Sequence, residues 1–515
     1  MSQTGPKKRE QAGLMIFFYT LAILFTVSFT SIATSAPKPE VTDTTITDAV
    51  ENELLMDVAI QSAGIDVTTK DGVVFLKGKI DNMLSKERAA NIARTVKGVR
   101  SVVNDIEVNP PLNIEDWQIK DYVEDALQAD PVASHFKINV GVKDSVVTLT
   151  GSVASWKERN ICEKVAEGVK GVKNIIDMIE INWTGGKEFD AGIKQEIERL
   201  LEWDSSVDNG LINVSVDHGK VYLKGSVGSA IEKMNATLDS YVDGVKEVDN
   251  SGLEVVKWQR EDAMRGKKYF HKLDSEIAQA VKRALKTEPR VSSFKIDVEV
   301  VPGTHEIKLR GTVDNLKAKN TATLKARKIV GVRSVVNRIK VRPEQNISDQ
   351  RIKEGVRKAL GRDPYLISYV IEVDVSNGVV KLYGDVDTAF EKSHAEDIAS
   401  GINGVVKVDN LLVIRNFSNT YTYDPWVNDT YLYDYYWYQN MPLHATKSDS
   451  EILKDIKNEL FWSPFVNADQ VKVKVDEGVA TLTGNVNSWL EHDAAMRCAY
   501  KGGATYVKNN LTVKK

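Results

Sequence analysis

The residues of this chain that could do chemistry are few and scattered. Its histidines never stand four residues apart, the spacing that places two metal ligands on one face of a helix. The sequence also lacks G-x-S-x-G, the P-loop and H-E-x-x-H, the motifs of serine hydrolases, phosphate-binding enzymes and zinc proteases. It therefore predicts no enzyme, no metal site and no cofactor. The histidines are His135, His218, His271, His305, His394, His444 and His492.

The densest group of candidate binding residues is a tyrosine- and tryptophan-rich insertion at 416–447. Nine aromatic residues fall within 18 positions there. Tyrosine and tryptophan suit half-wet surfaces, so the insertion is a candidate contact for a protein, a glycan or a membrane. Aspartates among them argue against anionic lipid, and the alternative is that the insertion packs on its neighbours as a cover. The nine residues are Tyr421, Tyr423, Trp426, Tyr431, Tyr433, Tyr435, Tyr436, Trp437 and Tyr438.

The charge of the chain argues against nucleic acid as a partner. Its 68 basic and 72 acidic residues are finely mixed and give a net charge of −4. Residues 168–171 and 401–404 have the G-x-x-G spacing of a nucleic-acid clamp, but helix termination explains these glycines. A basic-aromatic stretch at 258–272 is either a solvated linker or a contact for anionic headgroups.

Residues 1–40 differ from the rest of the chain. Lys7, Lys8 and Arg9 precede a long uncharged run whose apolar part is residues 14–33. This pattern is typical of a signal peptide or of a membrane anchor, and the sequence leaves both open. In either case the basic residues stay in the cytoplasm and the rest of the chain is exported.

The elements that must position any site come from one unit of about 70 residues, written six times. Its marker is a V-x-L-x-G-x-V strand, whose glycines are spaced by 73, 74, 86, 73 and 100 residues. A glycine in mid-strand weakens the strand unless the backbone needs close approach, so we expect structural glycines where a side chain would crowd a helix. These glycines are Gly78, Gly151, Gly225, Gly311, Gly384 and Gly484.

Each unit predicts the element order α-β-β-α-β. The first helix has apolar residues at i, i+4 and i+8, as in residues 46–54, and an aspartate before them, here Asp43, is expected to cap it. Two strands joined by a tight turn follow, and then a second helix that ends at a glycine such as Gly98. Cys162 and Cys498 fall on second helices of different units, so we expect buried free thiols.

The fold class is therefore α+β, with six tandem modules in which two helices cover a three-stranded sheet. One such module is small for independent stability, so packing between neighbouring modules is expected, with beads on a string as the alternative. Modules 1 to 6 are residues 43–109, 114–183, 189–257, 273–342, 347–415 and 448–515.

This pattern resembles the BON domain, found in bacterial hyperosmotically inducible periplasmic proteins and their relatives. The resemblance rests on the first-helix residues, the marker strand and a closing G-V-x-x-V-x-N segment, as in residues 98–104; module 2 departs from it with Asp177. It implies a periplasmic, non-enzymatic protein that associates with phospholipid surfaces or envelope partners in osmotic or envelope stress, and residues 14–33 would be its inner-membrane anchor if retained. The alternative is a periplasmic scaffold or spacer whose modules form homo-oligomers.

Overall fold

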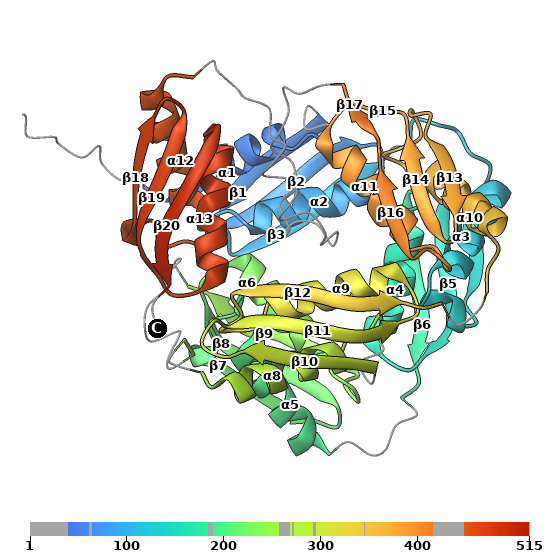
Figure 1. Ribbon diagram of the computed structural model, residues 1–515, viewed down its shortest axis with the longest axis horizontal. Helices are drawn as coiled ribbons and strands as arrows, with labels where there is room; N and C mark the ends of the chain where they lie inside the picture. The colour runs from blue at the N-terminus through green and yellow to red at the C-terminus, as the bar shows by residue number, and fades with distance from the viewer. Residues whose placement is uncertain are drawn as a thin grey trace, which may run out of the picture. The chain divides into compact units, whose positions relative to one another are not determined.

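A computed structural model of the chain describes residues 40–60, 64–183, 189–256, 268–269, 272–291, 295–343, 346–415 and 447–513. Within this described part each of the six modules has a first helix, two strands, a second helix and a third strand (Figure 1). The predicted α+β fold and its six copies are therefore confirmed.

The first helices are α1 (Asp43–Met56), α3 (Asp116–Ala129), α5 (Asp190–Trp203), α8 (Asp274–Lys286), α10 (Asp349–Arg362) and α12 (Asp449–Trp462). The second helices are α2 (Met83–Arg94), α4 (Trp156–Glu167), α6 (Ala230–Asp239), α9 (Leu316–Arg327), α11 (Ala389–Ser400) and α13 (Trp489–Lys501). Short 3-10 helices lie at Ala133–His135, Asn209–Leu211 and Ala468–Gln470.

The first strands are β1 (Ile65–Lys70), β4 (Asn139–Lys143), β7 (Ile212–Asp217), β10 (Ile296–Val301), β13 (Glu372–Ser376) and β18 (Val471–Asp476). The second strands are β2 (Val73–Ile80), β5 (Val146–Val153), β8 (Lys220–Val227), β11 (Glu306–Val313), β14 (Val379–Tyr383) with β15 (Asp385–Val386), and β19 (Val479–Val486). The third strands are β3 (Ser101–Val108), β6 (Asn174–Ile181), β9 (Glu247–Val255), β12 (Ser334–Val341), β16 (Lys407–Asn410) with β17 (Val413–Ile414), and β20 (Tyr506–Val513).

Every module has a mixed sheet in which the second strand is central. In module 1, β1 runs antiparallel to β2 and β3 runs parallel to it. A parallel pair needs a crossover connection, and the second helix supplies it. Figure 1 shows the result for module 4, where α8 and α9 lie behind the sheet of β10, β11 and β12. One face of each sheet is thus covered by helices and the other is left for contacts.

The predicted apolar stripe of the first helix lies in the core of every module. In module 1 the exposed fractions of Ile46, Val50 and Leu54 are at most 3%. The small residue expected on the second helix, Ala89, is fully buried, as are its counterparts. The helix itself ends earlier than predicted: α2 ends at Arg94, and the following turn contains Gly98, whose positive φ and missing side chain let it pack on the first helix.

The aspartate at the start of the first helix does not cap that helix. In module 1, Thr42 is the N-cap and Asp43 is the first helical residue. The Asp43 carboxylate instead accepts the backbone N–H groups of Asp71 at 2.7 Å and Gly72 at 2.9 Å, at the tip of the hairpin. Modules 2, 3, 5 and 6 have the same clamp. Module 4 has a longer tip, which Thr304 closes.

Glycine is required at the marker positions because the backbone that leads into the first strand, and not a helix, comes close there. Gly78 has φ +121°, and a Cβ there would lie 1.8 Å from the carbonyl oxygen of Gly64. In the six modules the corresponding distance to the residue that leads into the first strand is 1.8–2.6 Å. The expectation that a side chain would crowd the second helix is therefore wrong, because the obstruction is the chain entering the neighbouring strand.

An inward asparagine on the third strand ties it to the second helix. In module 6 the Asn509 side chain donates to the carbonyl oxygen of His492 at 2.9 Å and accepts the N–H of Leu511 at 3.3 Å. Module 2 has Asp177 in this place, and the Arg159 side chain supplies the donor at 2.6 Å. The departure noted in the sequence is thus a matched exchange of two residues.

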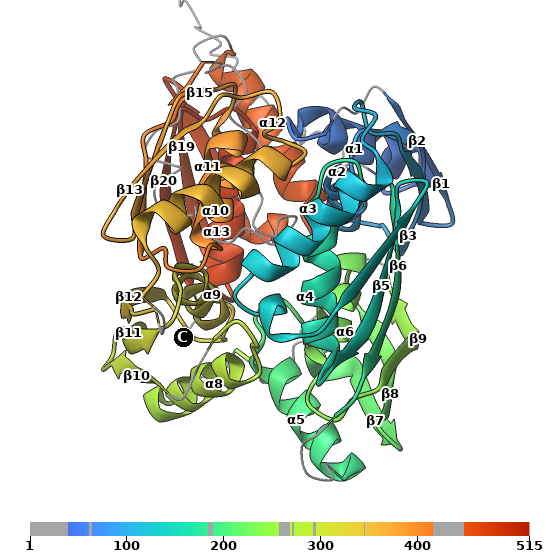
Figure 2. The same ribbon diagram turned by 90° about the vertical axis from the view of Figure 1, so that its right-hand side faces the viewer.

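The modules pair through one contact that is made three times. Each contact is a backbone hydrogen bond between two modules. The donor is the N–H of the residue before the glycine that follows a second helix. The acceptor is the carbonyl oxygen of the last residue of the other module's first helix. The three bonds are Lys97 to Trp462 at 2.9 Å between modules 1 and 6, Lys170 to Arg362 at 2.8 Å between modules 2 and 5, and Val330 to Trp203 at 2.8 Å between modules 4 and 3. First helices α3 and α10, and α5 and α8, lie side by side (Figure 2).

The hydrophobic cores are shared between modules. Ala230 of module 3 belongs to the core of module 1, and Ile231 to the core of module 6. Met83 of module 1 belongs to the core of module 2. Residues Glu40–Lys515 form one compact unit, so the modules are not beads on a string. Packing between modules was expected, but the pairing of modules far apart in the sequence was not.

Candidate functional site

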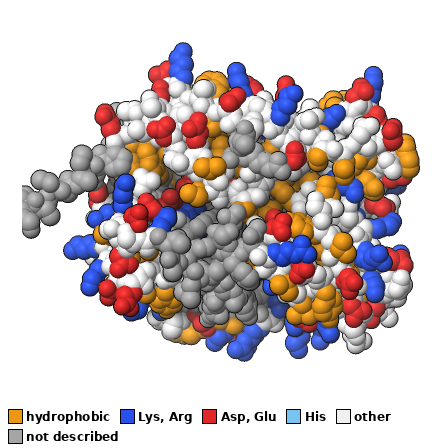
Figure 3. Space-filling view, turned by 90° about the horizontal axis from the view of Figure 1, so that it is seen from above, with side chains coloured by type: hydrophobic (Ala, Val, Ile, Leu, Met, Phe, Trp, Pro, Cys, Tyr) orange, Lys and Arg blue, Asp and Glu red, His pale blue; other side chains and the backbone are white. Residues whose placement is uncertain are grey.

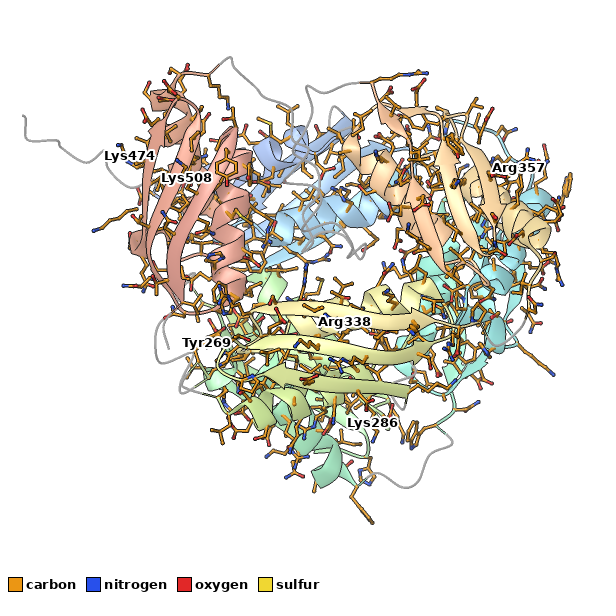
Figure 4. The ribbon with its side chains drawn as sticks, viewed as in Figure 1. Tyr269, Lys286, Arg338, Arg357, Lys474 and Lys508 are labelled. Carbon is orange, nitrogen blue, oxygen red and sulfur yellow. The ribbon has the colours of Figure 1, made fainter. Side chains whose placement is uncertain are left out.

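The predicted aromatic contact falls on residues 416–446, outside those that the structure describes, and its role stays a prediction. The described residues of the basic-aromatic linker, Lys268, Tyr269 and Lys272, contact module 3. Lys268 donates to the carbonyl oxygen of Leu201 at 2.8 Å, and the Tyr269 hydroxyl (Figure 4) donates to that of Ser205 at 3.1 Å. Burial lowers the pKa of Lys268. These side chains hold the linker to the module, so they are not available to a lipid headgroup.

The sheet faces turned away from the helices are the surfaces on which the modules differ most. Six residues cross each face in two rows of three, one from each strand, and we call these six positions the outer face of a module. In module 6 the strand register makes the rows Lys474, Thr481, Lys508 and Lys472, Thr483, Asn510.

The outer face of module 6 is basic. Lys472, Lys474 and Lys508 are exposed, and within the described part of the chain none has a carboxylate partner. Figure 4 shows Lys474 and Lys508 on the sheet of this module. They stand on the two strands that flank β19, so their backbones lie roughly 10 Å apart. Tyr506 follows the same face and is 57% exposed. This spacing suits several anionic groups spread over a surface better than a single small ion.

The outer face of module 2 is uncharged. Its rows are Gly141, Thr148, Ile176 and Asn139, Thr150, Met178. Ile176 is 47% exposed and Met178 is 60% exposed. Two large apolar side chains next to threonines on a flat sheet form a surface that loses little by being covered, because no charge has to be desolvated.

The remaining outer faces carry mixed charges. Module 4 adds Arg338 (Figure 4) to its face, but Glu299 there binds Arg310 at 3.5 Å. In module 5, Asp374 and Asp409 flank Lys381. On the side of the molecule drawn in Figure 3, basic, acidic and apolar side chains alternate over the described residues. Modules 2 and 6 therefore mark the two extremes.

A cavity of about 480 Å³ lies where second helices of modules 1 to 5 converge. Ion pairs between modules line it. Arg290 binds Asp130 at 3.0 Å between modules 4 and 2, and Lys317 binds Asp397 at 2.5 Å between modules 4 and 5. Burial, together with the nearby Asp204, raises the pKa of the Asp239 carboxyl to about 7. These charges fasten helices together, so we interpret the cavity as a seam between modules.

Neither cysteine is a reactive group. Cys162 and Cys498 are buried free thiols, as expected. Burial, reinforced by nearby carboxylates, raises the pKa of each to about 12. A thiol that stays protonated at neutral pH is a poor nucleophile and a poor metal ligand. Their role is to fill space beside the sheet.

Six stretches of the chain match the BON domain family, over residues 42–110, 115–182, 189–257, 273–343, 348–416 and 448–515. The chain belongs to the BON family. Each match covers one α-β-β-α-β unit, so the repeated fold is six BON modules in succession. The resemblance inferred from the marker strand and first-helix pattern is confirmed.

The chain is similar to several bacterial proteins, each of which matches less than a third of its residues. Osmotically-inducible protein Y of Escherichia coli is 30% identical over 142 residues, which cover 26% of this chain and 69% of that protein. Outer membrane lipoprotein DolP of Haemophilus influenzae is 25% identical over 146 residues, 27% of this chain and 75% of that protein. The 21 kDa hemolysin of Actinobacillus pleuropneumoniae is 25% identical over 145 residues, which cover 27% of this chain and 74% of that protein.

A solved chain of CdsD, a structural protein of the Type III secretion system of Chlamydia trachomatis, covers 40% of this chain and 90% of its own length. The identity is 14% and the TM-score is 0.12.

Among the described residues, no helix combines the length and the apolar character needed to cross a bilayer. The segment predicted as signal peptide or anchor, residues 14–33, lies outside them. Whether it is cleaved or retained stays a prediction.

The outer faces were not predicted from the sequence. In the V-K-V-K-V-D strand of module 6, lysines occupy the exposed alternate positions, and this part of the basic face could be seen in the sequence. Lys508 joins Lys472 and Lys474 only because β20 pairs in parallel with β19. No local sequence pattern predicts this set, because strand pairing brings together residues that are some 35 positions apart.

Proposed function

We propose that this BON protein is an exported, envelope-associated binding protein that docks on anionic phospholipid surfaces through the outer face of module 6. The observation that carries the proposal is the set of three exposed lysines on one sheet face, none of which has a carboxylate partner among the residues that the structure describes. The relatives include an osmotically inducible protein and an outer membrane lipoprotein, which supports a role at the cell envelope.

The strength expected of this face is modest. A lysine near an anionic membrane contributes about 1 kcal/mol, so three contribute about 3 kcal/mol, roughly a 100-fold gain in affinity. That is too weak to hold a protein on a membrane alone. Tyr506 at the edge of the face, further modules and the predicted aromatic insertion would have to add contacts, which is the way repeated modules reach useful affinity.

The test is co-sedimentation of residues 40–515 with vesicles of phosphatidylcholine alone or mixed with phosphatidylglycerol. Binding should require phosphatidylglycerol and weaken with salt. Changing Lys472, Lys474 and Lys508 to Gln should lower the affinity about 100-fold.

The matched control adds the same change in net charge to module 2, with Asn139→Glu, Thr148→Glu and Thr150→Glu. These residues occupy outer-face positions as well. If both triple variants lose binding equally, the effect comes from net charge and the proposed site is wrong. Equal binding of the wild type to neutral and anionic vesicles would also exclude it.

A second candidate function is a scaffold that self-associates, and the uncharged outer face of module 2 favours it. Among the six outer faces, it alone can be covered without burying a charge. The outer face of module 2 in a second molecule is therefore a suitable partner. Ile176→Lys with Met178→Lys should abolish dimers seen by light scattering. A monomeric wild type at tens of micromolar would remove this candidate.

A further inference from the structure

The contact between modules 1 and 6 differs chemically from the two equivalent contacts. Where first helices meet in the pair of modules 2 and 5, Asp125 binds Lys358 at 2.9 Å. In the pair of modules 3 and 4, Glu196 lies 3.7 Å from Arg283. In the pair of modules 1 and 6 two carboxyl groups meet, because Glu459 of α12 shares a hydrogen bond with Glu53 of α1. Two carboxylates cannot share a hydrogen bond unless one is protonated.

The surroundings of the acid pair decide which group keeps the proton. Lys501, at the end of α13, binds Glu53 at 3.0 Å. Glu459 is half-buried, and its loss of solvent, followed by the negative charge of Glu53, raises its pKa to about 8. At neutral pH, Glu459 therefore donates its proton to the Glu53 carboxylate.

The other charged groups around the pair do not replace this bond. On α12, Asp455 adds negative charge to Glu459, but Lys447 binds Asp455 at 2.8 Å. On α13, the Cys498 thiol stays protonated, with a pKa of about 12. Arg497 lines the same small cavity of about 40 Å³, which is large enough for the water that a proton transfer needs.

The acid pair is in the interface that joins the first module to the last. Trp462, one turn beyond Glu459, packs against the core of module 1 and accepts the N–H of Lys97 at 2.9 Å. The Lys97 ammonium lies 4.6 Å from the centre of the Phe461 ring. A charge created at Glu459 would stand in the middle of these contacts.

We propose that the interface of modules 1 and 6 is a proton-operated latch. It is closed while Glu459 is protonated and donates to Glu53. When Glu459 gives its proton to water, two carboxylates face each other over one lysine, and the modules separate. The pairs of modules 2 and 5 and of modules 3 and 4, which meet through opposite charges, stay closed over the same pH range.

The direction of the pH dependence follows from proton linkage. The closed state binds the Glu459 proton more tightly than an open state in which the carboxyl has its ordinary pKa of 4.5. The stability of closure is therefore complete below about pH 4.5, falls as the pH rises and levels off above about pH 8. The latch opens in alkaline solution and closes in acid.

The test measures hydrogen exchange of residues 40–515 between pH 6 and pH 8.5, with each rate corrected for the intrinsic pH dependence of exchange. The amide of Lys97 reports the latch. The amide of Lys170, which makes the equivalent bond to Arg362, is an internal control in the same sample. Protection at Lys97 should fall at least tenfold over this range, while protection at Lys170 stays constant.

Glu459→Gln imitates the protonated carboxyl, because its amide can still donate to Glu53. This variant should keep the protection of Lys97 at pH 8.5 close to its value at pH 6. Glu53→Gln, which removes the facing carboxylate, should also flatten the profile, and it serves if the first variant does not fold. A constant wild-type profile at Lys97, a parallel fall at Lys170, or a fall that persists in the folded variants would overturn the latch.

Discussion

Modules 2 and 6 have the same fold and the same strand register but opposite outer faces. Position by position, Thr148 of module 2 corresponds to Thr481 of module 6, and both are threonine. Their neighbours in the row are Gly141 and Ile176 in module 2 but lysines in module 6. Differences at four of the six outward positions thus separate a surface suited to an uncharged partner from one suited to an anionic partner.

The difference teaches that the inward half of a BON module is constrained while the outward half varies. Inward strand residues of both modules face the two helices of their own module, and the equivalent Leu149 and Leu482 are fully buried. Outward residues meet only solvent or a partner, where most substitutions cost little stability. Function in this chain is therefore expected to lie on the outer faces, and predictions that compare modules 2 and 6 test that division.

The largest effect is expected at the marker glycines, which both modules need. A Cβ at Gly484 would lie 2.0 Å from the Gln470 carbonyl oxygen, and one at Gly151 would lie 2.5 Å from that of Lys137. Gly484→Ala should cost about 3 kcal/mol or more, and Gly151→Ala about 2 kcal/mol, because both force a positive φ on alanine and the first meets the closer backbone. Hydrogen exchange of the full chain locates the loss in each module.

The opposite ranking, or no loss at either site, would show that the backbone relaxes around the methyl group. That result would also contradict the explanation that glycine is required at the marker positions because the chain entering the first strand lies too close for a side chain.

The next effect concerns the residue that ties the third strand to the second helix. Asn509→Asp in module 6 replaces a donor by a carboxylate that faces the His492 carbonyl oxygen, so it should cost about 2 kcal/mol. His492 occupies the place of Arg159 in module 2. The double variant Asn509→Asp with His492→Arg should therefore recover most of the loss, since it rebuilds the pair of Arg159 and Asp177.

Thermal unfolding of the single and double variants measures this coupling. Independent, additive effects would mean that Arg159 and Asp177 are not an exchange for the asparagine but two unrelated changes.

A smaller and equal effect is expected at the hairpin clamps of the two modules. Asp116→Ala and Asp449→Ala each remove the acceptor for two N–H groups, in module 2 and module 6 respectively, at a solvent-exposed tip. Each should cost about 1 kcal/mol. Asp274→Ala in module 4, where Thr304 closes the tip, is the control and should cost less. A larger loss at Asp274 would mean that the aspartate acts on the helix after all.

The smallest effect on stability is expected from removing the aromatic insertion before module 6. Replacing residues 421–438 by a Gly/Ser linker should leave the melting profile of modules 5 and 6 unchanged, because both have a complete core. Recovery of partners from an envelope extract should fall. Unfolding of module 6 in this variant would show that the aromatics belong to its core and that the interaction role is wrong.

Local patterns in the sequence identified the module and its core because each depends on residues close together in the chain. The spacing of Ile46, Val50 and Leu54 identifies the buried stripe of a helix, and the alternation along Val471 to Asp476 identifies a half-buried strand. The same patterns misplaced the partner of Asp43, since the hairpin tip that it clamps lies 28 residues away. A side-chain oxygen near a helix start has two possible donors, and only the folded hairpin shows which is nearer.

The sequence by itself determined six BON modules, their inward residues and the glycines at their marker strands. Only the tertiary structure decided that module 1 pairs with module 6 and module 2 with module 5, and that Lys508 joins Lys472 and Lys474 on one face. The physical reason is that periodicity tells which side of an element is apolar but not which distant element covers it. That choice depends on the fit of helix ends and on charges such as Glu53 and Glu459, which become neighbours only when the chain has folded.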